Sequence, residues 1–461
     1  MGAGKTTLGE AVARRLGRPF HDVDAELERD HGPIAGLFDT RGEAAFRELE
    51  ADAVARACSR REPSVVALGG GAVETSGLVE GLGALVVHVD VDVDTAWERV
   101  RASARPLARD ERDFRRRHEL RRPLYEAVAD AQAGDAEGVV LAAAGIRVAS
   151  HREARAEAVV ADETVAALHG IEATLHVPGG ETAKTVAEAD RLWRSLRVDR
   201  EGTVVAVGGG STTDLVGFVA ATHLRGVAWH AVPSTLVGQV DAAIGGKTAI
   251  DLPEGKNLVG AFHWPAETTL DPALLDTLPE EELANGLAEV VKTGLLCGEP
   301  LWELPREELV RRCAAFKAAI CLRDPFDRGE RAQLNLGHTF AHALEAASGY
   351  RLAHGAAVAL GLLAALRLSG LEHEARTVEE LLRPRLARVD PEAAWAALAR
   401  DKKAVDGEPR LVLLDAPGSP RLGVELQADE IRSAMDRNIC RCGTQLLILR
   451  AVERAAAKGG G

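Results

Sequence analysis

Three segments in the second half of the chain carry side chains that could hold a divalent metal ion. GLAEVVKTG contains Glu289, LNLGHTFAHALE contains His338 and His342, and LAHGAAVALG contains His354. Because His338 and His342 are four residues apart in a predicted helix, both lie on one of its faces. Two imidazoles and a carboxylate are a ligand set of catalytic Zn²⁺, which keeps its fourth coordination position open for water or substrate. The spacing leaves two histidine pairs open, His338 with His342 or His338 with His354. Histidines satisfied within the core are a further alternative.

A run of three glycines, Gly208–Gly210, lies between the apolar segment TVVAV and a predicted helix. A glycine turn in this position lets a pyrophosphate rest on the N-terminus of the helix. The spacing is not GxGxxG, so a tight turn without a ligand explains it equally well. Asp162 in VVADE, together with Glu181 and Lys184 in PGGETAK, offers groups that could bind ribose hydroxyls.

The first residues, MGAGKTT, have the composition of a phosphate-binding loop and run into the predicted helix LGEAVARRL. Gly2 and Gly4 would let backbone amides approach phosphate oxygens. Lys5 would reach the outer phosphates, and Thr6 would bind Mg²⁺. A chance match is the alternative for so short a motif.

Two aspartates, Asp22 and Asp24, follow in HDVDAELE. Because they are two residues apart, both would face one side if they ended a strand. One could then bind Mg²⁺ and the other accept a hydroxyl proton. A solvated turn is the alternative when this pair is considered alone.

The chain has 461 residues, a formal net charge of −14 and 46% hydrophobic residues. This length exceeds one compact core, so we expect two or three folding units. The negative charge argues against a nucleic-acid surface, and no apolar stretch is long enough for a membrane helix. Six scattered cysteines and first residues without a secretion pattern predict reduced thiols in a cytoplasmic protein.

The order of elements predicts an α/β protein in three folded parts followed by a tail. Residues 1–137 alternate helices with strands, of which VVALGG and ALVVHVDV are expected to be buried and parallel. Residues 138–272 form a second, Rossmann-like α/β series, which opens with a linker where GVVLA is expected as a short strand. Residues 273–436 are predicted to be an all-α metal-binding domain, and residues 437–461 differ in character from the rest.

The motifs GEAAFRELE, LGGGAV, ARPLA and RRPLYEAVA follow the phosphate loop in that order. Together they resemble shikimate kinase, a P-loop kinase, over nearly all of residues 1–130. The resemblance implies that Lys5 and Thr6 bind ATP and Mg²⁺. It also implies that Asp22 lies near the metal, that Asp24 contacts the shikimate hydroxyl, and that Arg105 comes from a mobile lid. The residues implied at the shikimate carboxylate and its neighbouring turn are Arg47, Arg121, Gly69, Gly70 and Gly71.

One part of the kinase pattern is absent, because no strand precedes MGAGKTT. In the kinase fold this strand lies in the middle of the sheet, so its loss leaves two neighbouring strands with unpaired backbone groups. Each unpaired buried group costs ~1–3 kcal/mol, so the loss rivals the ~5–15 kcal/mol that stabilises a domain. We therefore expect Met1 to be an internal methionine of a longer protein. Upstream codons for an apolar strand that ends in glycine, one residue before Met1, would support this expectation, and an in-frame stop there would contradict it.

The second half closely resembles 3-dehydroquinate synthase, from VVADE through VAVGGGSTTDLVGF to HAVPSTLVGQVDAAIGGKTAIDLPEGKNLVGAFHWP. The family pattern selects Glu289, His338 and His354 as ligands of Zn²⁺ or Co²⁺ and places His342 close to the substrate. The resemblance also implies NAD⁺, held by Asp162, Glu181, Lys184, Gly209, Gly210, Asp214, Thr235, Asp241, Lys256 and Asn257.

The same motifs carry many cations and amides, which predict a pocket for an anion with more than one charge. A sugar acid phosphate meets that need, because it has both a carboxylate and a phosphate. The resemblance assigns Lys247, Lys292, Arg331 and Asn335 to catalysis beside His342. It assigns Arg225, Lys317 and Lys402 to substrate binding.

The implied reaction converts the seven-carbon sugar acid phosphate DAHP to 3-dehydroquinate and phosphate. NAD⁺ is reduced and reoxidised within each turnover, and the metal polarises the reacting oxygen. The alternative is an NAD- and metal-dependent polyol dehydrogenase with a non-catalytic nucleotide-binding module. Lys247, Lys256 and Arg331 disfavour it, because a neutral alcohol needs no cationic cluster. The expected partners are DAHP, shikimate and ATP, without nucleic acid or membrane, and the sequence is compatible with a homodimer through the synthase part.

Some segments depart from the family patterns. Ala356 stands where the synthase family often has Glu, the stretch from Lys292 to Lys317 looks short, and the strands before VVADE are degenerate. The end of the chain, RNICRCGTQLLILRAVERAA with Cys440 and Cys442, resembles the end of the iron–sulfur subunit of molybdenum hydroxylases. An iron–sulfur cluster needs four thiolates and the partner CxxC is absent, so we expect no cluster there.

Overall fold

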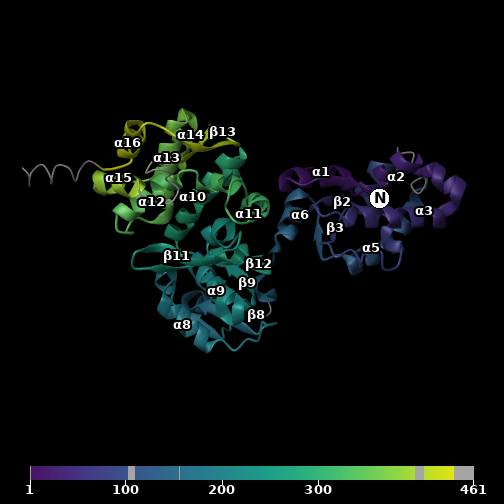
Figure 1. Cartoon of the computed structure of the whole chain (residues 1–461), viewed down its shortest axis with the longest axis horizontal. Coiled ribbons are helices and arrows are strands. Elements are labelled where there is room, and N and C mark those ends of the chain that lie inside the picture. The colour runs from purple at the N-terminus through teal and green to yellow at the C-terminus, as the bar shows by residue number, and fades with distance from the viewer. Residues whose placement is uncertain (1, 102–109, 155, 400–409, 441–461) are drawn as a thin grey trace, which may run out of the picture. The chain divides into compact units, whose positions relative to one another are not determined.

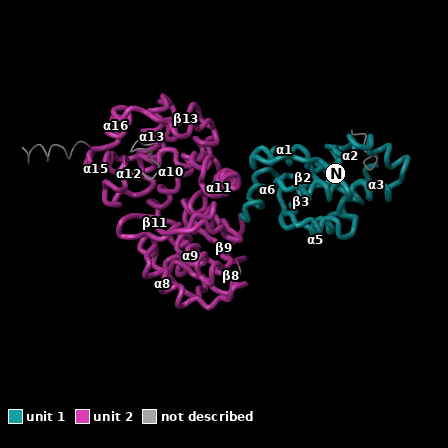
Figure 2. The backbone as a smooth tube through the Cα atoms, viewed as in Figure 1, with its two compact units in different colours: residues 1–146 teal, residues 147–461 magenta. Residues whose placement is uncertain are grey.

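The structure is a computed structural model that describes residues 2–101, 110–154, 156–399 and 410–440. Arg105, Lys402 and Cys442 lie outside these ranges. The chain divides into two compact units, residues 1–146 and 147–461 (Figure 2). Within the described ranges, no helix is both long and apolar enough to cross a bilayer. Helices and parallel strands alternate in both units, which confirms the predicted α/β class.

The first unit surrounds short strands with helices (Figure 1). Its strands are β1 (Phe20–Asp22), β2 (Val65–Ala67), β3 (Val87–Val89) and β4 (Ala131–Ala133). Its helices are α1 (Lys5–Leu16), α2 (Val23–His31), α3 (Ile34–Cys58), α4 (Val93–Val100), α5 (Glu111–Val128) and α6 (Ala136–Ala143), with a short 3₁₀ turn η1 (Ala72–Glu74).

The expectation of a strand at GVVLA was wrong, because these residues form most of α6. Asp135 starts the helix, since its side chain accepts a hydrogen bond from the backbone N–H of Gly138 at 2.8 Å. Val140 and Leu141 are buried, and α6 packs against α1. The first unit therefore extends to Ile146, beyond the boundary expected at residue 137.

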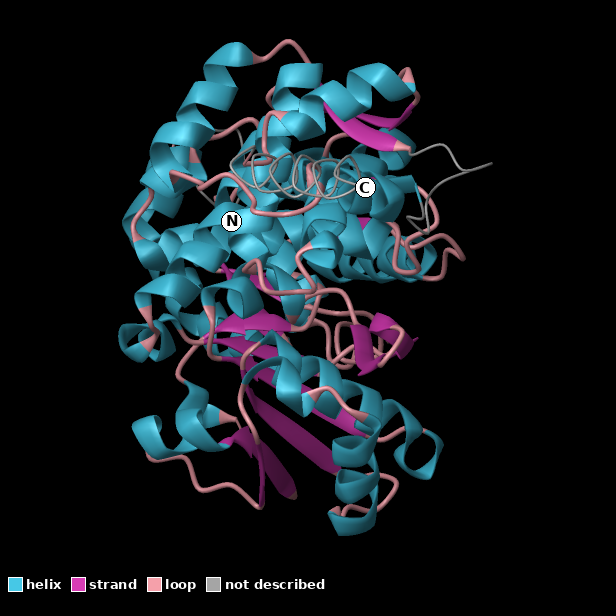
Figure 3. Ribbon diagram, turned by 90° about the vertical axis from the view of Figure 1, so that its left-hand side faces the viewer, coloured by secondary structure: helices cyan, strands magenta, loops and turns pink. Residues whose placement is uncertain are grey.

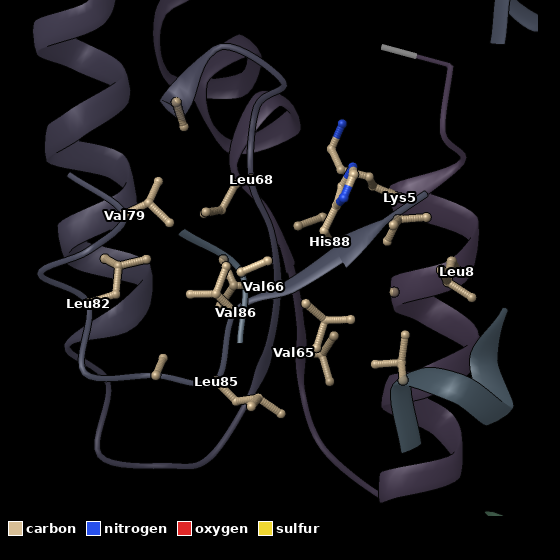
Figure 4. A pocket seen from close by; sticks show the side chains of 18 of the residues that line it. Lys5, Leu8, Val65, Val66, Leu68, Val79, Leu82, Leu85, Val86 and His88 are labelled. Carbon is tan, nitrogen blue, oxygen red and sulfur yellow. The ribbon is translucent and has the colours of Figure 1, made fainter. Parts of the chain in front are cut away.

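The strands of the first unit form two separate pairs instead of one sheet. β1 pairs with β2 and β3 pairs with β4, both in parallel. A cavity of about 540 Å³ is bordered by β2, β3 and α1, and most of its lining is apolar (Figure 4). Side chains that line it include Leu8, Val12, Val65, Val66, Leu82 and Val87.

The apolar side chains around this cavity lack the packing partners that a filled core provides. An apolar segment that filled the cavity would remove their surface from water, at about 25 cal/mol for each Å² of apolar surface, and would therefore stabilise the unit.

The second unit contains a six-stranded sheet in the order β5-β12-β9-β8-β6-β7. The strands are β5 (Ile146–Val148), β6 (Ala158–Asp162), β7 (Leu175–Val177), β8 (Thr203–Gly208), β9 (Ala228–Pro233) and β12 (Glu267–Leu270). The pairs β7–β6, β6–β8, β8–β9 and β9–β12 are all parallel. Helices α7 (Glu163–His169), α8 (Val186–Ser195) and α9 (Gly210–Thr222) accompany them, and β10 (Lys247–Leu252) and β11 (Gly255–Phe262) form an antiparallel hairpin.

The remainder of the second unit is mainly helical and has one large apolar core (Figures 1 and 3). Its helices are α10 (Glu280–Cys297), α11 (Arg306–Arg323), α12 (His338–Ala347), α13 (His354–Leu368), α14 (Glu372–Leu382), α15 (Pro391–Ala399) and α16 (Ala428–Asp436). This part is not all-α, because the antiparallel hairpin of β13 (Leu411–Ala416) and β14 (Ser419–Val424) places Leu413 and Leu414 in the core. Ile439 is buried in the same core, so the expected tail after residue 436 starts as part of it.

We predict that an added apolar strand stabilises the first unit. A chain extended before Met1 by five β-branched residues, one glycine and one further residue should fill the cavity. Its first thermal unfolding transition should then rise by at least about 5 °C in calorimetry. A matched extension with serine and aspartate at alternate strand positions is the control. Equal transition temperatures for the two extensions would contradict the prediction.

Candidate active sites

Three helices of the second unit bring Glu289, His338 and His354 together. Glu289 comes from the middle of α10, and the two histidines are the first residues of α12 and α13. The Oε1 atom of Glu289 lies 3.3 Å from Nε2 of His338 and 3.1 Å from Nε2 of His354. One donor atom of each of the three residues lies within 4.8 Å of the other two.

This arrangement fits a tetrahedral metal site. With metal–ligand distances near 2.0–2.1 Å, tetrahedral ligands lie about 3.3 Å apart, close to both distances from Glu289. The second ring nitrogen of each histidine faces an acceptor, because Nδ1 of His338 donates to the carbonyl of Leu336 at 3.2 Å and Nδ1 of His354 donates to Glu345 at 3.1 Å. Each Nε2 is therefore left as the electron-pair donor that a metal requires.

A buried lysine separates this triad from a second carboxylate. Lys292 is 2% exposed, and its Nζ contacts Glu289 Oε2 and lies 3.6 Å from Asp241 Oδ1. Burial alone would lower the pKa of Lys292, but the carboxylates of Asp241 and Glu289 outweigh it and raise the pKa. Lys317 Nζ also lies 2.8 Å from Asp241 Oδ1. Lys292 and Lys317 thus both place their Nζ atoms beside one aspartate.

The glycine turn lies at the edge of the sheet where β8 and β9 end together, since Gly208 pairs with Pro233. Gly209 and Gly210 begin α9, and no side chain caps this helix start. The first amides of α9 are therefore open to an anion such as pyrophosphate. A Cβ atom on Gly209 would lie 3.1 Å from Thr235 Cγ2, and one on Gly210 would lie 3.0 Å from Ala242 Cβ. The turn thus borders η6 (Gly238–Ala242), which carries Asp241.

Charged side chains from three elements surround the turn. Lys184, which is 3% exposed, contacts Asp214 of α9 at 2.8 Å and the side-chain oxygen of Asn257 on β11. Burial raises the pKa of Asp214 to about 6, although Lys184 acts in the opposite direction. Glu181 accepts a hydrogen bond from Ser211 Oγ at 3.2 Å and lies 3.7 Å from Lys256 Nζ. Asp162 ends β6 and caps α7, with its Oδ1 accepting from two backbone amides.

One further candidate, His342, lies beside the triad, and two others, Lys247 and Arg331, lie at a neighbouring turn. His342 is exposed beside His338, with ring centroids 5.5 Å apart. Lys247 Nζ pairs with Asp327 Oδ2 at 2.6 Å, and the buried Arg331 donates to the carbonyl of Gly245 at 2.9 Å. These two cations thus flank the Gly245–Gly246 turn.

Two further candidates are Asn335, which is hydrogen-bonded within its own turn, and Arg225, which lies far from the glycine turn. The side-chain Nδ2 of Asn335 donates a hydrogen bond to the backbone carbonyl of Ala332 at 2.9 Å. Arg225 is exposed at the far end of α9 from Gly210, about 20 Å along the helix axis. Arg225 is therefore remote from the glycine turn of its own chain.

The kinase-like residues of the first unit also converge. Thr6 Oγ1 donates to Asp22 Oδ2, and Asp22 Oδ1 caps α2. Asp24 is not on the strand with Asp22 but in the first turn of α2, because Asp22 starts that helix. A Cβ atom on Gly69 would lie 2.8 Å from Asp24 Oδ1, so the two residues adjoin and only glycine fits. Phosphate loop, aspartates and glycine turn therefore form one site.

The structure distinguishes the two candidate arginines of RRPLYEAVA. Arg121 is 4% exposed and points toward the same place as Arg47, where both contact Glu74. Arg122 is exposed and pairs with Glu126 on its own helix at 2.9 Å. Tyr125 fixes the glycine turn, since its hydroxyl donates to the carbonyl of Gly70 at 2.6 Å.

Sequence reasoning missed three carboxylates that hold these sites together. Glu345 is seven residues after His338 and so on the same helix face, a spacing that could have indicated its role. Glu50 follows Arg47 by three residues and accepts from it at 2.6 Å, which is also a recognisable helical pair. Glu74 lies in a turn, and no periodic signal in the sequence indicates it.

Two family models match adjoining parts of the second unit. A family model described as 3-dehydroquinate synthase N-terminal matches residues 174–285, and one described as 3-dehydroquinate synthase C-terminal matches residues 286–404. The 3-dehydroquinate synthase of Symbiobacterium thermophilum is 38% identical, and the match covers 62% of this chain and 91% of that protein. The chain belongs to the 3-dehydroquinate synthase family. The 3-dehydroquinate synthase of Paracoccus denitrificans is 41% identical over 60% of this chain and 88% of its own length.

Two further comparisons bear on the two units of this 3-dehydroquinate synthase family member. The shikimate kinase family model matches residues 1–146, which is the whole first unit. Among solved structures, 2-epi-5-epi-valiolone synthase from Streptomyces hygroscopicus with NAD⁺ and Zn²⁺ bound is 26% identical with a TM-score of 0.55. That match covers 64% of this chain and 91% of that protein.

We predict that Glu345 orients His354 for metal binding. In Glu345→Gln the amide replaces a charged acceptor, so the His354 ring is held less firmly and is a weaker ligand. The affinity for Zn²⁺ should fall by about 10–100-fold, measured by competition with a chromogenic chelator. Glu372→Gln, at an exposed position on α14, is the matched control. Equal Zn²⁺ affinities for Glu345→Gln and wild type would refute an orienting role.

Proposed function

We propose that the second unit converts DAHP to 3-dehydroquinate and phosphate. The observation that carries this proposal is the approach of Glu289, His338 and His354 to within 4.8 Å of one another, in a chain of the 3-dehydroquinate synthase family. The ligand set suits Zn²⁺ or Co²⁺. When bound, the metal supplies a Lewis acid for a substrate oxygen, and NAD⁺ supplies reversible oxidation of a substrate alcohol.

The NAD⁺ site that we propose uses the glycine turn and the charged groups around it. The first amides of α9, at Gly209 and Gly210, would hold the pyrophosphate. Lys184 and Glu181 come from one loop and would bind ribose hydroxyls. The ion pair of Lys184 with Asp214 holds the lysine in place, and Asp162 and Thr235 would complete the walls of the site.

The cationic side chains near the triad would bind the two anionic groups of the substrate. Lys292 and Lys317 are both buried, and both lie beside Asp241. Lys247 and Arg331 flank the Gly245–Gly246 turn and would hold the substrate phosphate. A polyol substrate offers no charge for these groups, which favours the synthase over the dehydrogenase alternative.

His342 is the proposed proton carrier of the synthase site. It lies beside His338 on the exposed side of α12, so it can exchange protons with solvent. Its imidazole is not one of the three metal-binding groups, and imidazole is a side chain that can carry a proton near neutral pH. Asn335, from the 3₁₀ turn η9 (Glu330–Asn335) before α12, is proposed to bind the substrate nearby.

For the first unit we propose ATP-dependent phosphorylation of shikimate. Thr6 and Asp22 would bind Mg²⁺, and Asp24 would accept the proton of the substrate hydroxyl. Arg47 and Arg121 would hold the shikimate carboxylate beside Gly69, Gly70 and Gly71. Lys5 of the phosphate loop lines the cavity between β2 and β3.

Both proposed substrates are small anions, and we propose that the protein acts on them in the cytoplasm. The formal net charge of −14 supports small-molecule partners rather than nucleic acid. Local cationic sites are then needed to attract an anion against the charge of the whole chain. The clusters around Lys292 and around Arg121 provide such sites in the two units.

The synthase proposal predicts phosphate release from DAHP that depends on both NAD⁺ and a divalent metal. His338→Ala removes one of three ligands and should lower the rate by about two orders of magnitude or more, as should chelation of the wild type. Restored Zn²⁺ should rescue the chelated wild type but not His338→Ala. His373→Ala, on α14, is the matched control. Undiminished turnover after both chelation and substitution would remove the metal from the mechanism.

A further inference from the structure

The first unit holds a carboxylate at the point where two arginines meet. Glu74 is the last residue of η1, just after the Gly69–Gly71 turn. Its Oε1 accepts from Nε of Arg121 at 3.0 Å, and its Oε2 accepts from Nη2 of Arg121 at 2.6 Å. The same Oε2 accepts from Nη2 of Arg47 at 2.8 Å. Glu74 thus makes a bidentate contact with one guanidinium and a single contact with the other.

These three contacts are the ones by which arginines bind a free carboxylate. The two arginine side chains come from different helices, α3 and α5, and are 15% and 5% exposed, whereas the Glu74 side chain is 37% exposed. The guanidinium groups are therefore fixed in the wall of the site, and the carboxylate lies on its open side. Glu74 occupies the position that a small carboxylic acid would take.

Glu74 is one of three carboxylates that contact Arg47. Arg47 has a second partner in Glu50, whose side chain is 1% exposed and cannot leave easily. Glu43 also contacts Arg47, at 3.1 Å, so Arg47 keeps two carboxylate partners when Glu74 turns away. The hydrogen bond from Arg121 holds the pKa of Glu74 below its usual value, so Glu74 is ionised at neutral pH. When Glu74 turns away, Arg121 loses both of these hydrogen bonds to a carboxylate and can form them with another one.

We propose that Glu74 competes with the substrate carboxylate for Arg47 and Arg121. The proposal rests on the proposed shikimate-binding role of the first unit. Glu74 must turn toward solvent before a substrate carboxylate can bind both guanidinium groups. It can do so because it ends a 3₁₀ turn of only three residues and the next residue, Thr75, has an extended backbone. Glu74 thereby sets the affinity of the site for carboxylate-bearing ligands.

Equilibrium binding of shikimate to the full chain tests this competition. Glu74→Gln keeps the shape of the side chain but removes its charge, so the Kd for shikimate should fall about tenfold in calorimetric titration. Glu43→Gln is the matched control, because Glu43 also contacts Arg47, at 3.1 Å, but it is 60% exposed and does not contact Arg121. We expect its Kd to stay within about twofold of the wild-type value.

A neutral ligand tests whether any gain in affinity for shikimate depends on the charge of its carboxylate. The methyl ester of shikimate has no carboxylate charge, so Glu74→Gln should not tighten its binding. Shikimate binding by Glu74→Gln that is equal to or weaker than that of wild type, including no detectable binding by either, would overturn the proposal. An equal gain for the ester would also overturn it. Formation of shikimate 3-phosphate from ATP is measured separately: tighter shikimate binding without phosphate transfer would refute kinase activity and still support the competition.

Discussion

Glu289 is a fully buried carboxylate, and much of the second unit is arranged to neutralise it. An ionised carboxylate without partners inside a protein costs several kcal/mol. Its partners are His338, His354 and Lys292, contributed by the starts of α12 and α13 and by α10 itself. Burial raises the pKa of Glu289, but Lys292 and His338 more than reverse this and hold the pKa well below its usual value. Three helices must therefore meet at one point, and that point has the ligands of a divalent metal.

The same charge network joins the helical part to the sheet. Asp241 lies in η6, a short π-helical turn that follows β9, and it faces Lys292 of α10 and Lys317 of α11. The turn η6 also borders Gly210 at the start of α9. The proposed pyrophosphate site and the proposed metal site are therefore linked through Asp241 of η6 and Lys292, which contacts Glu289. A dinucleotide on α9 and a metal on Glu289 would therefore face one substrate.

The sequence predicted the fold class and the main site segments because these depend on local patterns. TVVAV before Gly208 and the histidine motifs are short apolar or polar runs whose meaning does not depend on distant residues. The choice between His342 and His354 could not come from spacing, since it depends on how α12 and α13 pack. The choice of Arg121 over Arg122 likewise follows from which side of α5 is buried.

Other features needed the three-dimensional structure. GVVLA has the composition of a strand, but the cap at Asp135 and the packing of α6 on α1 make it helical. The position of Glu74 between two arginines depends on the path of an irregular turn, for which the sequence has no periodic signal. The size of the cavity between β2 and β3 likewise follows only from the structure.

The central claim is that Glu289, His338 and His354 share one metal ion. X-ray absorption spectroscopy at the zinc edge, on the full chain loaded with one equivalent of Zn²⁺, tests it most directly. We expect a first shell of nitrogen and oxygen near 2.0–2.1 Å, with outer scattering from two imidazoles. That outer scattering should fall to one imidazole in His354→Ala. A sulfur shell near 2.3 Å, or a spectrum unchanged by the substitution, would contradict the claim.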